Sequence, residues 1–246
     1  MRAFSAVALG LLLLAGGASA ETIDAAALYK THCADCHGAT RLGGQGPALM
    51  PESLRRLRKK KALRVIAEGR TQTQMPPFTG TLSEAEIAAV VAYVYRPPAV
   101  PPRWAAAEIR NSRVLYRSVA ELPAAPTHGA DPLNLFVVVE SGDHHVTILD
   151  GDRLMPLTRF QSRYALHGGP KFSPDGRFVY FASRDGWIAK YDLHGLDLVA
   201  EVRAGINTRN LAISADGKVL AAANYLPHTL VLLDAADLSL LDVIEV

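Results

Sequence analysis

The chain holds only two cysteines, which lie in the segment THCADCHGAT (residues 31–40) with a histidine directly after the second. Cys33, Cys36 and His37 suit three kinds of site in principle. A structural zinc ion needs four protein ligands, and no second cysteine pair exists. A thioredoxin-like dithiol follows a strand, whereas these cysteines end a helix-forming stretch. The pattern C-x-x-C-H is typical of one covalently attached haem c, with two thioether bonds and His37 on the iron.

A second iron ligand is expected in the loop RTQTQMPPFTG (residues 70–80), about forty residues after the cysteines. Met75 in this loop precedes two prolines, which hold the backbone rigid. Thioether sulfur opposite histidine raises the reduction potential of haem iron, which suits electron transfer. Met75 could instead pack in a hydrophobic core. The rigid loop favours the ligand.

Three helices are expected to position these residues, within a domain of residues 21–96. The first leads into the cysteine motif, and the second covers PESLRRLRKKKALRVIAEG (residues 51–69), where leucines recur at helical spacing. The third begins at a capping box formed by Ser83 and Glu86. Over roughly residues 22–96 the chain therefore resembles the class I cytochromes c, whose motif residues match Cys33, Cys36, His37 and Met75.

The second predicted helix is strongly basic. This run is either a solvated helix face or a surface that attracts an acidic redox partner, and the sequence leaves both open. Its members are Arg55, Arg56, Arg58, Lys59, Lys60, Lys61 and Arg64. The formal net charge of the whole chain is only +2, which gives no indication of nucleic-acid binding.

The N-terminus has the features of a signal peptide over residues 1–20. Arg2 precedes the apolar run AVALGLLLLAGG, and Ala18-Ser19-Ala20 forms a cleavage signal. The run is too short to span a membrane, so the mature protein is expected to be periplasmic, with no membrane span. After the first domain, RPPAVPPR (residues 96–103) opens a proline-rich linker assigned to residues 97–110.

From residue 133 onward, short β-rich runs recur with a period near 42 residues. Asp175-Gly176 recurs as Asp216-Gly217, and three aspartates that end strands also lie 42 apart: Asp150, Asp192 and Asp234. The expected strands are LFVVVES, HVTILD, RFVYFAS, WIAKYDL, VLAAANY and TLVLLDA. A D-G turn in each repeat of this length is typical of β-propeller blades.

The predicted fold is thus an all-α class I cytochrome c domain followed by an incomplete β-propeller of about three blades over residues 111–246. A closed propeller needs at least four blades. The chain is therefore expected to be the N-terminal part of a longer protein, with eight blades in the parent. A small sandwich of three sheets is the alternative.

Three segments of the repeat region carry a further resemblance: RYALHGGPKFSPDGRFVYFASRDGWIAKYDL, AGINTRN and ANYLPHTLVLLD. They resemble the haem d1 propeller of the dihydro-haem d1 dehydrogenase and cytochrome cd1 nitrite reductase family. The resemblance implies that His167 is the proximal ligand of the d1 iron. The glycines at 168 and 169 would leave room beside it for a flat ligand.

The same resemblance implies that Arg184, Arg209 and Lys171 contact d1-haem carboxylates, which guanidinium groups bind well. Tyr225 lines this pocket or packs in the core, with equal support for each. The pair His144-His145 is interpreted as a turn feature and not as a metal site. No catalytic acid or base is assignable, because the family's distal residues come largely from later blades.

The implied activity is oxidation of a propionate of dihydro-haem d1 to an acrylate, with electrons leaving through haem c. Implied partners are a redox protein or other electron acceptor, and haem d1 biosynthesis proteins or a nitrite reductase as recipient, in denitrification. The rivals are a nitrite reductase that holds mature haem d1, and a non-catalytic carrier of haem d1 or of electrons.

Overall fold

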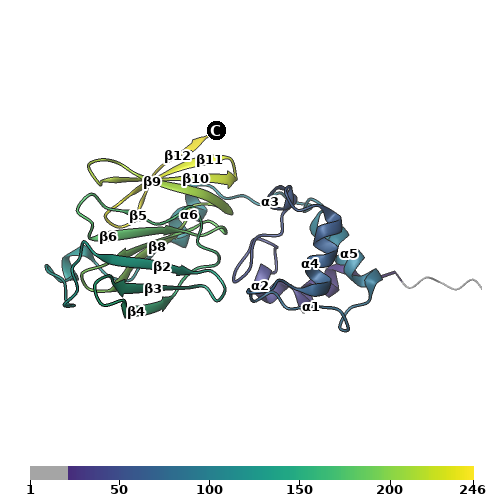
Figure 1. Ribbon diagram of the computed structural model, residues 1–246. Coiled ribbons are helices and arrows are strands. Elements are labelled where there is room, and N and C mark those ends of the chain that lie inside the picture. Colours follow the sequence, from purple (N-terminus) through teal and green to yellow (C-terminus); the bar gives the residue numbers. More distant parts are fainter. Residues whose placement is uncertain (1–21) are drawn as a thin grey trace, which may run out of the picture.

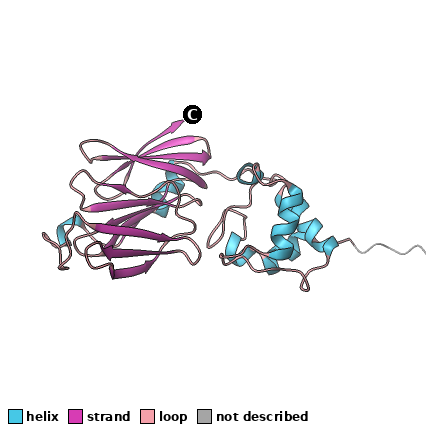
Figure 2. Ribbon diagram, in the orientation of Figure 1, coloured by secondary structure: helices cyan, strands magenta, loops and turns pink. Residues whose placement is uncertain are grey.

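The computed structural model describes residues 22–246, so the predicted signal peptide lies outside the described part of the chain. Figure 1 shows a helical N-terminal domain beside three stacked antiparallel sheets. Figure 2 shows that the strands lie in the second part, which also contains two short helical segments. No helix within residues 22–246 is both long and apolar enough to cross a membrane.

The helical domain contains five helices, of which the last begins as the sequence predicts. The Ser83 side chain accepts the backbone N–H of Glu86, and the Glu86 carboxylate accepts the backbone N–H of Ser83 at 2.8 Å. Tyr29, Leu54, Val90 and Val94 form the core between the helices. The helices are α1 (Ala25–His32), α2 (Ala34–His37), α3 (Pro51–Leu54), α4 (Lys59–Glu68) and α5 (Glu84–Val94).

One expectation for this domain is wrong: residues 51–69 do not form a single helix. α3 ends at Leu54, and Arg58 has extended backbone angles before α4 begins. The break leaves the carbonyl oxygen of Leu57 without a helical partner, and the hydroxyl of Tyr95 donates to it instead. A tertiary contact thus replaces a helical hydrogen bond, which a single-helix pattern of leucines does not reveal.

The three sheets have the strand order of propeller blades, which confirms the predicted fold class. Apart from one strand added at the edge of the second sheet, each is an antiparallel meander in which successive strands are neighbours. The first sheet contains β2 (Leu135–Glu140), β3 (His145–Asp150) and β4 (Met155–Gln161). The second contains β5 (Lys171–Phe172), β6 (Phe178–Ala182), β7 (Trp187–Asp192) and β8 (Asp197–Arg203), and the third contains β9 (Asn207–Ile213), β10 (Val219–Leu226), β11 (Thr229–Asp234) and β12 (Leu240–Glu245).

The segment after the prolines packs on the second sheet. The helix α6 (Ala106–Ser112) begins within the range predicted as linker and packs against β8 and β12. β1 (Val114–Leu115) then adds to the outer edge of the second sheet by pairing with β8. This pairing satisfies backbone donors and acceptors of β8 that would otherwise be exposed at the sheet edge.

The repeated D-G turns have the same construction in both blades. Ser173 Oγ donates to the Asp175 carboxylate at 2.5 Å, and Ser214 Oγ donates to that of Asp216 at 2.6 Å. The glycine that follows each aspartate has a positive φ, 72° at Gly176 and 70° at Gly217. Glycine adopts this conformation without the steric penalty that other residues incur. The 41-residue sequence repeat is thus a structural repeat.

The sheets are held face to face by two hydrophobic clusters. Val146 and Ile148 of the first sheet pack against Val179, Phe181 and Tyr191 of the second. The second cluster joins the second sheet to the third and includes Ile188, Val202, Leu220 and Val231. Side chains of alternate strand positions therefore fill the space between neighbouring blades, as expected for stacked sheets.

A buried lysine crosses the same junction. Lys190, which is 1% exposed, donates from Nζ to the carbonyl oxygens of Ala235 at 2.9 Å and Ala236 at 2.8 Å. Its ammonium group also lies 3.7 Å from the centre of the Phe178 ring. Burial lowers the pKa of Lys190 to about 8, although Asp192 acts in the opposite direction. The second and third sheets are therefore joined by a polar contact inside their apolar interface.

This lysine predicts a pH dependence of stability. Between pH 8 and about 10.4, the usual lysine pKa, the folded chain binds fewer protons at Lys190 than the unfolded chain does. The free energy of unfolding contributed by this residue therefore rises with pH across that window, by on the order of 3 kcal/mol. We expect the wild type to gain stability relative to Lys190→Met when urea unfolding is repeated near pH 10 instead of pH 7.5. Lys218→Met, at an exposed position, should show no such divergence, and parallel pH curves for wild type and Lys190→Met would contradict the assignment.

Candidate functional site

The cysteine motif folds into a single turn of helix. Cys33 is the N-cap of α2, and its carbonyl oxygen accepts the backbone N–H of His37 at 2.9 Å. Residues four apart on a helix share one face, so Cys33 and His37 lie on the same side of the turn. No disulfide joins the two cysteines, so both sulfur atoms are open to thioether bonds. The motif therefore has the geometry and the free sulfurs that thioether attachment requires.

His37 is built to present one nitrogen to a metal. The ring is 8% exposed, and Nδ1 lies 2.8 Å from the carbonyl oxygen of Pro47. A carbonyl oxygen only accepts, so Nδ1 carries the proton and Nε2 keeps its lone pair. Burial lowers the pKa of His37, which favours the neutral ring. A Cβ at Gly46 would lie 2.8 Å from the ring, so only glycine fits there. These features fit a haem c iron ligand.

Met75 lies in the loop between α4 and α5, as its prolines suggest. The backbone N–H of Arg70 donates to the carbonyl oxygen of Met75 at 3.1 Å, which closes the loop on itself. The methionine is half-buried, and residues 68 and 70–77 line a hollow of about 400 Å³ in this loop. Its assignment as second iron ligand stays a prediction.

His167, on the propeller side, has the same construction as His37. Its Nδ1 lies 3.2 Å from the carbonyl oxygen of Arg209 in β9, and its backbone N–H donates to Ala182 at 2.7 Å. Nδ1 is again the protonated nitrogen, which leaves Nε2 for a metal. The histidine is exposed, and a Cβ at Gly169 would meet no heavy atom within 4 Å. A flat ligand could therefore approach the ring from this side.

The other predicted d1-haem contacts gather around His167. Lys171 donates from Nζ to the carbonyl oxygen of Gly168 at 3.2 Å, and Arg209 already contacts His167 through its backbone. The backbone N–H of Arg184 donates to Ala165 at 3.1 Å. Hydrogen bonds thus connect Lys171, Arg184 and Arg209 to residues 165–168, while the roles of all four predicted residues in binding stay predictions.

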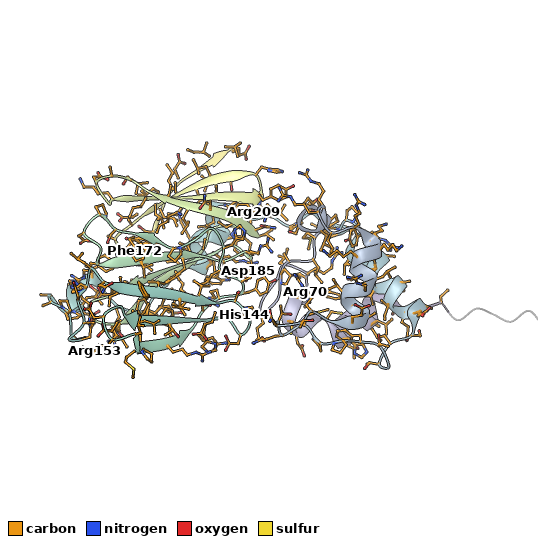
Figure 3. The ribbon with its side chains drawn as sticks, in the orientation of Figure 1. Arg70, His144, Arg153, Phe172, Asp185 and Arg209 are labelled. Atoms are coloured by element: carbon orange, nitrogen blue, oxygen red, sulfur yellow. The ribbon has the colours of Figure 1, made fainter. Side chains whose placement is uncertain are left out.

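The turn with the histidine pair lies next to the Met75 loop. A Cβ at Gly142 would lie 3.1 Å from the carbonyl oxygen of Gln72. His144 adopts φ 61° in this turn, is buried, and packs edge-on against Tyr164 at 5.1 Å between ring centres. Burial raises the pKa of Tyr164, while the charges of Arg184 and Arg70 act to lower it. Both predicted haem sites therefore border the boundary between the domains, where Figure 3 shows Arg70 and His144.

Arg203 joins the domains at this boundary, and sequence patterns did not single it out. Its Nε donates to the carbonyl oxygen of Asp185 at 2.8 Å, and its Nη2 donates to that of Leu42 in the loop after α2. Its guanidinium group lies 4.7 Å from the Trp104 ring, whose Nε1 donates back to the carbonyl oxygen of Arg203 at 2.9 Å. One side chain thus contacts the haem c loop, the linker and the propeller.

Asp185 packs against the loop that follows α2. It is 1% exposed, and a Cβ at Gly43 would lie 3.2 Å from its own Cβ. Burial raises the pKa of Asp185, and Ser183 Oγ donates to its carboxyl group. No periodicity or motif marks this residue in the sequence, because its burial is created by the other domain.

Two family models match the chain in the order that the fold suggests. Residues 20–94 match the model described as cytochrome C oxidase, cbb3-type, subunit III, and residues 130–246 match the cytochrome D1 heme domain. A dihydro-heme d1 dehydrogenase of Pseudomonas aeruginosa is 62% identical over 240 residues, which cover 97% of this chain and 48% of that protein. The chain belongs to the dihydro-haem d1 dehydrogenase and cytochrome cd1 nitrite reductase family.

More distant relatives of this family share parts of the same architecture. A nitrite reductase of Stutzerimonas stutzeri is 27% identical over 237 residues, which cover 89% of this chain and 42% of that protein. Protein NirF of Pseudomonas aeruginosa is 34% identical over 116 residues, which cover 47% of the chain and 29% of the relative. The chain spans about half the length of the dehydrogenase and the nitrite reductase.

A solved structure supports the same assignment. The structure described as dihydro-heme d1 dehydrogenase NirN in complex with DHE superposes with a TM-score of 0.81 at 64% identity, covering 89% of this chain and 47% of that one. The family resemblance seen in the sequence and the predicted fold class are thereby confirmed. The cytochrome c domain implies covalent haem c, which Cys33, Cys36 and His37 would hold.

The first site prediction concerns Met75. If its thioether binds the haem c iron, the oxidised protein should show the weak near-infrared sulfur-to-iron absorption band, and Met75→Ala should abolish it. Met155→Ala, an exposed methionine in the first sheet, is the matched control and should leave the band unchanged. Persistence of the band in Met75→Ala would assign the sulfur ligand elsewhere.

The second site prediction concerns Arg203. Arg203→Met removes the donors to both domains but keeps an aliphatic side chain over Trp104. We expect trypsin to cleave the Arg103–Trp104 bond faster, because the linker tryptophan loses its guanidinium contact and keeps only its hydrogen bond to the backbone of residue 203. Fragment masses over a digestion time course measure this. Arg117→Met is the control. It removes an exposed arginine that pairs with Asp197 at 3.9 Å. This variant should be digested at the wild-type rate. Equal rates for the two variants would exclude Arg203 as the interdomain contact.

Proposed function

We propose that the protein oxidises a propionate side chain of dihydro-haem d1 to an acrylate. The observation that carries this proposal is the 62% identity to a dihydro-heme d1 dehydrogenase over nearly the whole chain, against 27% to a nitrite reductase. The solved relative described as a complex with DHE adds support, because its fold covers most of this chain.

The propeller loops supply groups suited to such a substrate. His167 presents Nε2 beside the open space at Gly169, so we infer that it holds the tetrapyrrole iron from one face. The ammonium group of Lys171 bonds to Gly168 beside this position, and the backbones of Arg184 and Arg209 bond to Ala165 and His167. Guanidinium groups bind carboxylates through paired N–H donors, which orients the substrate as well as attracting it.

Conversion of a propionate to an acrylate removes two hydrogen atoms, that is two electrons and two protons. Haem c, when bound, supplies one-electron acceptor chemistry, so an external acceptor must be available for both electrons. We infer that the cytochrome domain serves this transfer, with a redox protein as partner. We also propose that the protein is periplasmic and that it passes its product to proteins of the haem d1 and nitrite reductase system.

The decisive experiment is turnover by the protein purified from its host. Incubation with dihydro-haem d1 and a one-electron acceptor should yield a tetrapyrrole that has lost two hydrogen atoms, as measured by mass spectrometry after extraction. An unchanged substrate, together with nitrite reduction in the presence of mature haem d1, would favour the reductase. Binding without either reaction would favour a carrier.

Variants at His167 test the assigned site within the same experiment. His167→Ala should change the absorption spectrum of the bound tetrapyrrole, because an iron ligand is lost. Arg184→Gln should weaken binding by roughly ten- to a hundredfold and leave the ligand spectrum alone. His145→Ala, at the start of β3, is the control. A wild-type spectrum for His167→Ala would remove the histidine from the iron.

A further inference from the structure

The ring of Tyr225 lies close to two guanidinium groups that come from different domains. The Cζ atom of Arg55, which follows α3 in the cytochrome domain, is 5.4 Å from the ring centre. The Cζ atom of Arg209, on β9 of the propeller, is 5.1 Å from the same centre. Figure 3 shows Arg209 at the sheet ends that face the cytochrome domain. The tyrosine thus connects a basic residue of each domain.

Neutral contacts hold the two arginines close to each other. Asn207, two residues before Arg209, donates from Nδ2 to Ser53 Oγ at 3.2 Å, and Ser53 lies two residues before Arg55. The short helix α3 also packs against β10, which carries Tyr225. The approach of Arg55 to Arg209 is therefore fixed by an amide–hydroxyl bond and by packing, and not by attraction between opposite charges.

Positive charge from both domains acts on Arg209. Burial lowers the pKa of Arg209, and the like charges of Arg184 and Arg56 lower it further. Guanidinium groups nevertheless stay charged in proteins, so the repulsion persists in the folded chain. A cluster of like charges at an interface is destabilising unless an anion lies among them.

No anion from the described part of the chain meets these groups. Several other arginines, such as Arg159, Arg163 and Arg177, have a carboxylate within 3 Å. In contrast, within residues 22–246 no ion pair or side-chain hydrogen bond is formed by Arg55, Arg56, Arg184 or Arg209. Their N–H donors are therefore available to a ligand that carries several negative charges.

We propose that Arg55 of the cytochrome domain and Arg209 of the propeller together bind carboxylates of the tetrapyrrole, so that the substrate bridges the two domains. This inference rests on the proposed function, because it names a tetrapyrrole polycarboxylate as the ligand. Arg209 is suited to the role because its backbone also accepts a bond from His167 Nδ1. The iron ligand and the shared carboxylate site are thereby linked through one residue, and Tyr225 provides the surface between them.

The cytochrome domain then contributes to substrate affinity as well as to electron transfer. The substrate would relieve the repulsion that Arg184 and Arg56 exert on Arg209, and by contacting Arg55 as well it would hold the domains together while it is bound. Loss of one charge-assisted contact of this kind should weaken binding by about tenfold or more.

The test compares two substitutions that each remove one positive charge from the same basic run. Dihydro-haem d1 is titrated into the protein purified with haem c in place, and the dissociation constant is measured from the tetrapyrrole absorption. Arg55→Gln should weaken binding about tenfold or more. Lys60→Gln lies on exposed α4, with no contact to Tyr225, and should change affinity by less than about twofold. Haem c absorption and thermal unfolding verify that each variant is folded.

A tetrapyrrole with methyl-esterified carboxylates provides the second arm. It should bind wild type and Arg55→Gln equally, because no carboxylate remains to distinguish them. In a cycle with Arg209→Gln, the double variant should lose less affinity than the sum of the single variants, since both contact one ligand.

The possible outcomes distinguish failure of the shared carboxylate site from failure of the proposed function. If Arg55→Gln and Lys60→Gln lose the same affinity for dihydro-haem d1, long-range electrostatic attraction explains both losses. That result would overturn the shared site. If wild type and Arg55→Gln bind dihydro-haem d1 equally tightly, the shared site is wrong, but the proposed function is not contradicted. Failure of the wild type to bind dihydro-haem d1 at all would overturn both.

Discussion

The side chain of Arg203 holds three segments in one place, and the relation between the two candidate haem sites depends on it. Its guanidinium group donates to the loop that follows the cysteine motif and to the blade turn that contains Asp185, and it stacks on the linker tryptophan. Burial lowers the pKa of Arg203, so its charge is held in place at an energetic cost. Backbone carbonyl oxygens accept its hydrogen bonds, and a carbonyl at a fixed position leaves little freedom for the domains to slide.

The two candidate metal ligands have the same hydrogen-bonding arrangement, although the folds around them differ. His37 on a helix and His167 on a propeller loop both direct Nδ1 at a backbone carbonyl oxygen. This bond selects the tautomer and fixes the orientation of the ring, which leaves Nε2 as the donor to a metal. The environments differ in exposure: His37 is buried against Gly46, while His167 lies beside open space. A permanently attached cofactor suits the first setting, and an exchangeable ligand suits the second.

The boundary between the domains combines neutral contacts with unpaired positive charge. Elsewhere in the propeller a buried carboxylate pairs with a partly exposed arginine. Asp192 pairs with Arg177 in this way, and Glu201 pairs with Arg163. At the boundary, Arg55 and Arg209 share a tyrosine without a carboxylate. A stable interface between charged surfaces normally has complementary signs. This unpaired positive charge is the observation from which we propose that a polycarboxylate bridges the boundary.

The fold class could be read from the sequence because its signals are local. The C-x-x-C-H motif, the Ser83–Glu86 capping box and the repeated D-G turns each depend on a few consecutive residues, and the structure forms the helix start and the turns as expected. Strands with continuous apolar runs, such as β6 and β11, could also be predicted from the sequence. The sequence did not predict β4, β8, β9 and β12, because polar residues interrupt their apolar pattern. In β8, for example, Glu201 is buried because Arg163 pairs with it from another segment.

The sequence by itself determined the chemistry available to this protein, a covalent haem motif and a histidine followed by two glycines, together with the blade repeat. The tertiary structure alone decided which residues meet across the domains. The helix break at residues 55–58 depends on the hydroxyl of Tyr95, the burial of Asp185 depends on the loop at Gly43, and the pairing of Arg55 with Tyr225 depends on α3 lying against β10. Such contacts join residues up to about 170 positions apart, and a local pattern carries no information about partners at that separation.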